Sequence, residues 1–88
     1  MRIKQEYEVR EIAGENTVIV QGRRGVDLTK IITFNDSALL LWNSLAGRDF
    51  ETHDAARILS DNYSVDTETA ERDAREWVRN MKEHGLVD

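Results

Sequence analysis

Residues 30–47 read Lys-Ile-Ile-Thr-Phe-Asn-Asp-Ser-Ala-Leu-Leu-Leu-Trp-Asn-Ser-Leu-Ala-Gly. This stretch predicts a short strand that turns directly into a capped helix. Residues 31–34 are β-branched or aromatic, as strand residues often are. Asn35 is a favoured N-cap, and Gly47 suits the residue just past a helix end. We therefore expect a helix over residues 35–46, whose apolar stripe at helical spacing consists of Ala38, Leu41, Trp42 and Leu45.

The sequence before this stretch has the pattern of strands. Tyr7 and Val9 alternate with charged residues, which is typical of a half-buried strand. Residues 13–16 contain Gly and Asn, which tolerate the positive φ of a turn. Residues 17–21 form the second expected strand, so the two segments should make a hairpin. A loop over residues 22–29 then leads to the third strand at residues 30–34.

The sequence after this stretch predicts two more helices. Thr52 is the expected N-cap of the first, with buried positions at Ala55, Ile58 and Leu59 and an end at Tyr63. The second begins at Asp66 and ends before Gly85, which lets Leu86 fold back on Met81. Its apolar face consists of Ala70, Ala74, Trp77, Val78 and Met81. The order predicts an α+β fold in which residues 1–88 are a single domain: a three-stranded antiparallel β-meander followed by a three-helix, winged-helix-like bundle.

Composition narrows the classes of function. The chain has 88 residues, a formal net charge of −5 and no cysteine, so disulfides and thiolate metal sites are excluded. The acidic balance disfavours nucleic-acid binding, which needs several cations at the contact surface. No apolar run approaches the length of a membrane span, and the first residues lack an apolar signal region. We expect a cytoplasmic protein that binds neither nucleic acid nor membrane.

The residues that could carry catalysis do not form a recognisable site. His53 and His84 are expected near helix ends and have no metal-ligand spacing. A triad of Ser60, His53 and Asp54 lacks a nucleophile elbow. The glycines of the loop at 22–25 do not lead from a strand into a helix, so they do not resemble a phosphate loop. We expect no enzyme activity, no cofactor and no metal.

Two groups of charged residues could each be either a solvated surface or a binding surface. Arg23 and Arg24, between two glycines, are interpreted as a solvated loop tip, or as a contact to phosphate or to an acidic partner. The helix at 66–84 carries Arg72, Arg75, Arg79 and Lys82 among glutamates. Pairs four residues apart, Glu68–Arg72 and Glu71–Arg75, favour a salt-bridged solvent face. The alternative is a recognition surface beside the sheet.

The third strand carries the most specific functional signal. If residues 31–34 form an edge, the strand has unpaired N–H and C=O groups, and no proline blocks pairing. An open edge beside a helix is suited to β-strand addition, in which backbone bonds give affinity and side-chain pockets give specificity. The alternatives are an edge protected by a loop or by self-association.

Several short phrases occur in a fixed order along most of the chain. They are Arg10-Glu11-Ile12 before Gly14-Glu15, residues 32–38 followed by Leu41-Trp42, Thr52, residues 63–66, Ala70 with Asp73, and Gly85-Leu86-Val87. In the order and spacing of these phrases the sequence resembles the PqqD-like family, of the coenzyme PQQ synthesis protein D type. One departure is Ala74 and Trp77, where the family more often has a larger aliphatic residue and Phe; the two changes compensate in volume.

The resemblance implies a non-catalytic peptide-binding module, also called a RiPP recognition element or peptide chaperone. Such modules hold the leader of a ribosomally made precursor peptide and present it to a modifying enzyme, often a radical SAM enzyme. The leader adds to the third strand and lies against the third helix. On this chain the implied peptide-binding residues are Lys30, Ile31, Ile32, Thr33, Phe34, Arg72, Arg75 and Arg79.

Two rival functions remain open from the sequence. The first is a winged-helix nucleic-acid binder that uses the helix at 66–84 and the Arg23–Arg24 tip. The second is a structural module that dimerises by pairing its edge strand with a second copy.

Overall fold

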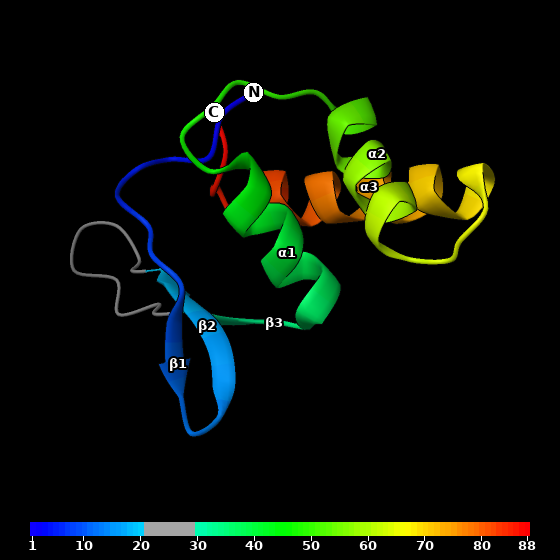
Figure 1. Cartoon of the computed structure of the whole chain (residues 1–88). Coiled ribbons are helices and arrows are strands. Elements are labelled where there is room, and N and C mark those ends of the chain that lie inside the picture. The colour runs from blue at the N-terminus through cyan, green and yellow to red at the C-terminus, as the bar shows by residue number, and fades with distance from the viewer. Residues whose placement is uncertain (21–29) are drawn as a thin grey trace.

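A computed structural model describes residues 1–20 and 30–88, and the backbone but not the side chain of Lys30. Three strands precede three helices, as the sequence predicts (Figure 1). The strands are β1 (Arg10–Ile12), β2 (Glu15–Val20) and β3 (Lys30–Phe34), and the helices are α1 (Asp36–Leu45), α2 (Thr52–Asn62) and α3 (Thr67–Glu83). The sheet is antiparallel, so the fold class is α+β. The expectations for the loop at 22–29, including Arg23 and Arg24, lie outside the described residues.

The first hairpin differs from its prediction in position and in turn length. β1 begins at Arg10 rather than near Tyr7, and the turn consists of Ala13 and Gly14 alone, with φ of 53° and 82°. Two consecutive residues with positive φ make a type I′ turn, whose twist matches that of the strands it joins. Tyr7 and Val9 lie outside the ladder, where they pack against the core as partly buried side chains.

Side chains cap each helix at its first turn. The Asn35 Oδ1 accepts from the backbone N–H of Ala38 at 2.9 Å, which confirms the predicted start of α1. Asp66 Oδ1 accepts from the N–H of Thr69 at 2.7 Å in the same way at α3. The N-cap of α2 is Glu51. The prediction of Thr52 as this N-cap, which rested on its hydroxyl group, is wrong.

A carboxylate, and not a hydroxyl, caps the first turn of α2. The backbone N–H of Glu51 donates to Asp54 Oδ2 at 2.8 Å. That hydrogen bond is the main cause that lowers the pKa of Asp54 below its ordinary value of 3.8. Hydrogen bonds from Thr69 likewise lower the pKa of Asp66. Both caps are therefore strongest when the carboxylates are ionised.

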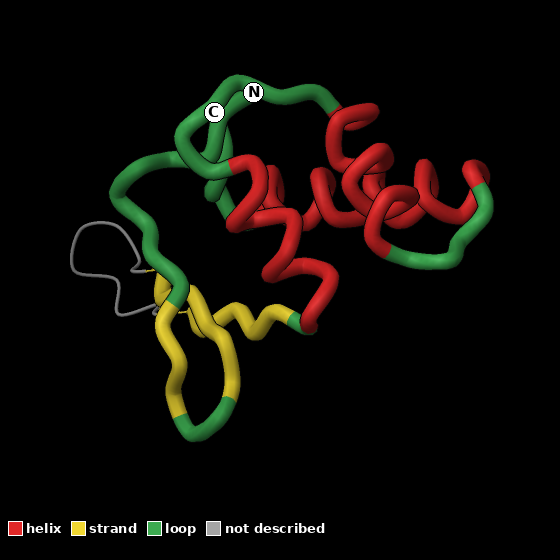
Figure 2. The backbone as a smooth tube through the Cα atoms, in the orientation of Figure 1, coloured by secondary structure: helices red, strands yellow, loops and turns green. Residues whose placement is uncertain are grey.

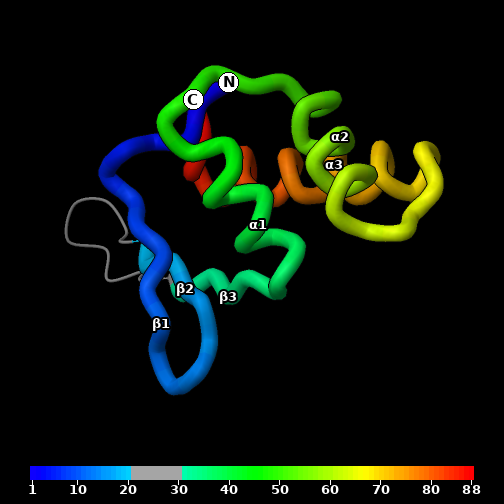
Figure 3. The backbone as a smooth tube through the Cα atoms, viewed as in Figure 1, coloured from blue at the N-terminus to red at the C-terminus, as the bar shows by residue number. Residues whose placement is uncertain are grey.

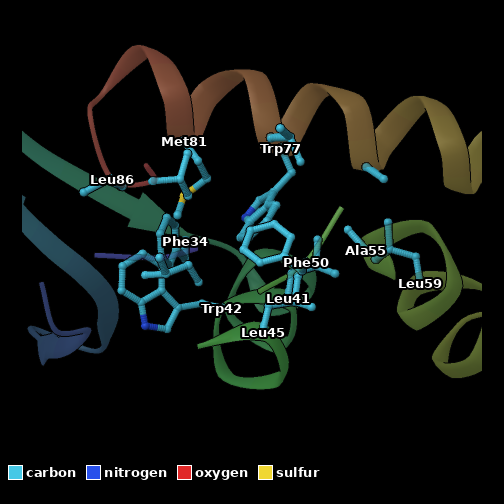
Figure 4. Packing of buried hydrophobic residues seen from close by; sticks show 14 of the residues in the cluster. Phe34, Leu41, Trp42, Leu45, Phe50, Ala55, Leu59, Trp77, Met81 and Leu86 are labelled. Atoms are coloured by element: carbon cyan, nitrogen blue, oxygen red, sulfur yellow. The ribbon is translucent and has the colours of Figure 1, made fainter. Parts of the chain in front are cut away.

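Both tryptophans lie in one hydrophobic core, as predicted (Figure 4). Trp42 is 5% exposed and Trp77 is 8% exposed. The Phe50 ring packs on Trp77 with ring centroids 6.0 Å apart, which ties the α1–α2 connection to α3. All five residues predicted for the apolar face of α3 are buried. In α2 the buried residues are Ala55, Ala56 and Leu59, whereas Ile58 is only partly buried.

The two ends of the chain lie side by side near the C-terminal end of α3 (Figure 2, Figure 3). Gly85 has a φ of 69°, which ends the helix, and the N–H of Leu86 donates to the carbonyl of Met81 at 2.9 Å. Ile3 and Val87 then form an antiparallel bridge. The predicted return of Leu86 onto α3 is confirmed, and it anchors the C-terminal end of that helix beside the sheet.

Candidate functional site

β3 is an edge of the sheet. The strand order is β1-β2-β3, so β3 pairs only with β2 among the described elements. Its register with β2 is antiparallel and continuous over all five residues, from Lys30 opposite Val20 to Phe34 opposite Asn16. The edge that the sequence predicts is therefore confirmed.

The turn geometry determines which polar groups of β2 turn toward β1. In a β-turn the first carbonyl accepts from the N–H three residues later, which makes Ile12 and Glu15 a hydrogen-bonded pair. Bonded and non-bonded pairs alternate along an antiparallel ladder. The backbone groups of Glu15, Thr17 and Ile19 therefore turn toward β1.

The intervening residues of β2 turn their backbone groups toward β3. Their partners in β3, in register, are Phe34, Ile32 and Lys30. It follows that Ile31 and Thr33 direct their N–H and C=O groups away from β2, to the outer edge. Within residues 1–20 and 30–88 no strand pairs with this outer edge, so the backbone groups of Ile31 and Thr33 can bond to an added strand.

A groove of about 700 Å³ opens between β3 and α3. The two elements run in roughly opposite directions in both views (Figure 1, Figure 4). Residues from β3, α1, α2 and α3 contribute to it. The residues that line the groove include Ile32, Thr33, Phe34, Leu41, Tyr63, Val65, Asp73, Glu76, Trp77, Asn80, Met81, His84 and Leu86.

The groove has an apolar floor and a polar rim. The floor consists of buried core residues, with Phe34 and Trp77 supplying aromatic surface and Leu41, Met81 and Leu86 the rest. The rim on α3 consists of the exposed residues Asp73, Glu76 and Asn80. Such a combination of apolar area and a few polar groups is typical of ligand sites.

The strand residues predicted for the site are brought to this groove. Ile32, Thr33 and Phe34 line it, and the backbone of Lys30 opens the same strand. Ile31 is not among the groove-lining residues, and its side chain is 64% exposed. Its contribution to the edge is its backbone.

The predicted arginines are placed elsewhere on α3. Arg72, Arg75 and Arg79 are exposed and are not among the groove-lining residues. Among the described residues, the ion pairs expected between Glu68 and Arg72 and between Glu71 and Arg75 are not formed. In the described part of α3, the ion pair is Arg72 Nε with Asp73 Oδ1 at 3.6 Å.

The sequence analysis did not predict the side of the groove formed by α3 and by the segment after α2. The missed groove residues are Tyr63, Val65, Asp73, Glu76, Asn80 and His84. A signal for the α3 members existed, since Asp73, Trp77 and Asn80 follow at spacings of four and three. Such residues share one face of a helix.

The histidines have local roles in the structure. His53 Nε2 lies 3.6 Å from Asp54 Oδ1 at the start of α2, and His84 Nδ1 lies 2.8 Å from the Asn80 carbonyl at the end of α3. Within residues 1–20 and 30–88, no group of three His, Cys, Asp or Glu side chains is placed to hold a metal.

Comparison with known proteins identifies the family. A family model described as coenzyme PQQ synthesis protein D (PqqD) matches residues 16–87, which is most of the chain. A search of curated proteins and a search of solved structures found no match. This chain belongs to the PqqD family, as its sequence pattern predicts. None of the described helices has the length and apolar character needed to cross a membrane.

Proposed function

We propose that residues 1–88 form a single, non-catalytic adaptor that binds the leader of a ribosomally made precursor peptide. The leader adds as a strand to β3, lies in the groove against α3, and is thereby presented to a modifying enzyme, for example a radical SAM enzyme. The observation that carries this proposal is the outer edge of β3, where Ile31 and Thr33 direct backbone groups beside an apolar groove. Strand addition of this kind is a recurring mode of peptide recognition.

Family membership supports an accessory role. PqqD proteins are accessory, non-catalytic proteins, and the family description names coenzyme PQQ synthesis. The precursor peptide of coenzyme PQQ synthesis is therefore the first ligand to test, followed by short precursors encoded beside this chain's own reading frame. The adaptor needs no cofactor of its own, because the enzyme that it serves carries out the chemistry.

The proposal is tested by titrating the leader into the ¹⁵N-labelled chain and following the backbone amide signals by NMR. Strand addition predicts the largest changes at the amides of Ile31 and Thr33, since these donors gain a partner. The matched control is the same leader with its residues in scrambled order. Binding that perturbs only the Arg75 and Arg79 face of α3 would overturn strand addition.

Self-association uses the same edge and gives a distinct result. A dimer that pairs two copies of β3 would occupy Ile31 and Thr33 without any leader. Sedimentation analysis at rising protein concentration then shows a dimer, which the leader dissociates if it competes for that edge. A monomer that binds the leader one to one is the result that the adaptor proposal expects.

A further inference from the structure

The groove contains a buried hydrogen-bond donor without a partner. Within the described residues, the indole Nε1 of Trp77 has no acceptor, although Trp77 is only 8% exposed. Trp77 lines the groove, and its nitrogen lies on the ring edge nearer to Phe34 and Met81 (Figure 4). A buried donor left unpaired destabilises the folded chain. An oxygen that a ligand brings to this position would therefore be stabilised there.

The rim beside this donor is acidic. Asp73 and Glu76 are both exposed on the groove side of α3. Glu76 forms no ion pair with any residue in the described ranges, and Arg72 approaches Asp73 at 3.6 Å with both side chains largely in solvent. Arg72 offsets part of the charge of Asp73, whereas Glu76 has no such partner in the described ranges. The rim therefore presents net negative charge next to an apolar floor.

Building on the proposed function, we infer that the groove selects a peptide strand with a Lys or Arg side chain facing Asp73 and Glu76. The long aliphatic stem of such a residue can lie on the apolar floor while its charged end stays at the rim. Residues two apart in a strand face the same side. We therefore infer that a large apolar residue lies two positions from the cation, and that an oxygen of the peptide accepts from Trp77 Nε1.

The test is selection from a display library of random peptides long enough for one strand, roughly ten residues. The wild-type chain and the Glu76→Lys variant are the two targets. The matched control is Glu71→Lys, at another exposed glutamate of α3 that is not among the groove-lining residues. Both substitutions change the net charge equally, so the control separates the local effect of the rim from the overall acidity of the chain.

The expected result is enrichment of Lys or Arg two positions from an apolar residue on the wild type and on Glu71→Lys. On Glu76→Lys the preference should be lost or should change to Asp and Glu. Enrichment of strands without that cation, or an equal loss on Glu71→Lys, overturns the inference and leaves peptide binding intact. No enrichment of any peptide on the wild type overturns the proposed function itself.

A second variant tests the role of the indole nitrogen. Trp77→Phe keeps an aromatic ring on Phe50 and removes the unpaired donor, which offsets part of the cost of the lost ring volume, so the variant should remain folded by circular dichroism. The affinity for the selected peptide should fall by about threefold to tenfold, which is the usual contribution of one hydrogen bond. Unchanged affinity in a folded Trp77→Phe variant shows that the nitrogen does not contact the peptide.

Discussion

The rings of Phe34 and Trp42 lie with their centroids 5.5 Å apart at an interplanar angle of 46°. Phe34 is the last residue of β3, and Trp42 lies in the second half of α1. Tilted aromatic pairs at this distance stabilise beyond the area they bury. The contact fixes the end of the edge strand against the core, and Phe34 also lines the groove. The shape of the candidate site therefore depends on the packing of Trp42.

Replacing Trp42 tests this dependence. Because Trp42 is 5% exposed and packs on Phe34, Trp42→Ala should lower the free energy of unfolding by about 3 to 5 kcal/mol. Urea unfolding followed by circular dichroism measures the loss. Ile31→Ala is the control, since Ile31 is 64% exposed and its removal should change stability by less than about 0.5 kcal/mol. A loss below about 1 kcal/mol for Trp42→Ala would contradict the packing described here.

The pH dependence of stability should follow the helix caps. The pKa values of Asp54 and Asp66 are lowered by hydrogen bonds that form only in the folded chain. At pH values near and below 3.8 the unfolded chain therefore binds more protons at these sites than the folded chain does. Their stabilisation is present above that pH and is lost as the pH falls through the folded pKa values.

The variant Asp66→Asn isolates one cap. Asn keeps an oxygen that can accept from the N–H of Thr69 but does not titrate. Urea midpoints measured at neutral pH and at several values below 3.8 should show a shallower decline for the variant than for the wild type. An identical decline in both chains would show that Asp66 contributes nothing to the acid sensitivity.

The sequence predicts the helices better than the first strand, for a physical reason. α3 combines a helical period of apolar residues, an Asp66 cap and a Gly85 stop, and all three signals agree. β1 has only three residues, all exposed, so it has no alternation of buried and exposed side chains. The alternation that suggested a strand at Tyr7 and Val9 comes from packing against the core without strand pairing.

The candidate site could be predicted in part from the sequence. The edge strand follows from element order and from the absence of proline, and its neighbour in the groove is the helix that the family resemblance implies. On α3 the family resemblance implied the flank that carries Arg72, Arg75 and Arg79. Side-chain direction is set by helical angle instead, and it brings Asp73 and Glu76 to the groove. The unpaired Trp77 nitrogen depends on tertiary packing, which no local pattern shows.

The arginines of α3 should have a small effect on leader binding. Arg75 and Arg79 are exposed and do not line the groove, so Arg75→Glu or Arg79→Glu should weaken binding by less than about fivefold. Isothermal titration calorimetry at two salt concentrations measures the change, which should lie mostly in the salt dependence. A loss of a hundredfold or more, roughly 3 kcal/mol, would mean that the leader contacts this face.

The same variants address the nucleic-acid alternative. Duplex DNA bound by these arginines would show an affinity that falls steeply with salt and is lost in both variants. With a formal net charge of −5, we expect no such binding at moderate salt. Tight DNA binding by the wild type with a steep salt slope would favour the winged-helix interpretation over the adaptor.

Two adjacent proline substitutions test strand addition at the edge of β3. Thr33 directs its N–H outward and Ile32 directs its N–H to β2, according to the turn geometry and the register. Proline removes a donor, so Thr33→Pro should spare the ladder within the sheet, whereas Ile32→Pro removes one of its hydrogen bonds. We expect Thr33→Pro to remain folded by circular dichroism and to lose leader binding in the NMR titration. Ile32→Pro should instead lower the urea midpoint. A folded Thr33→Pro variant that binds the leader as tightly as the wild type would exclude β3 as the docking edge.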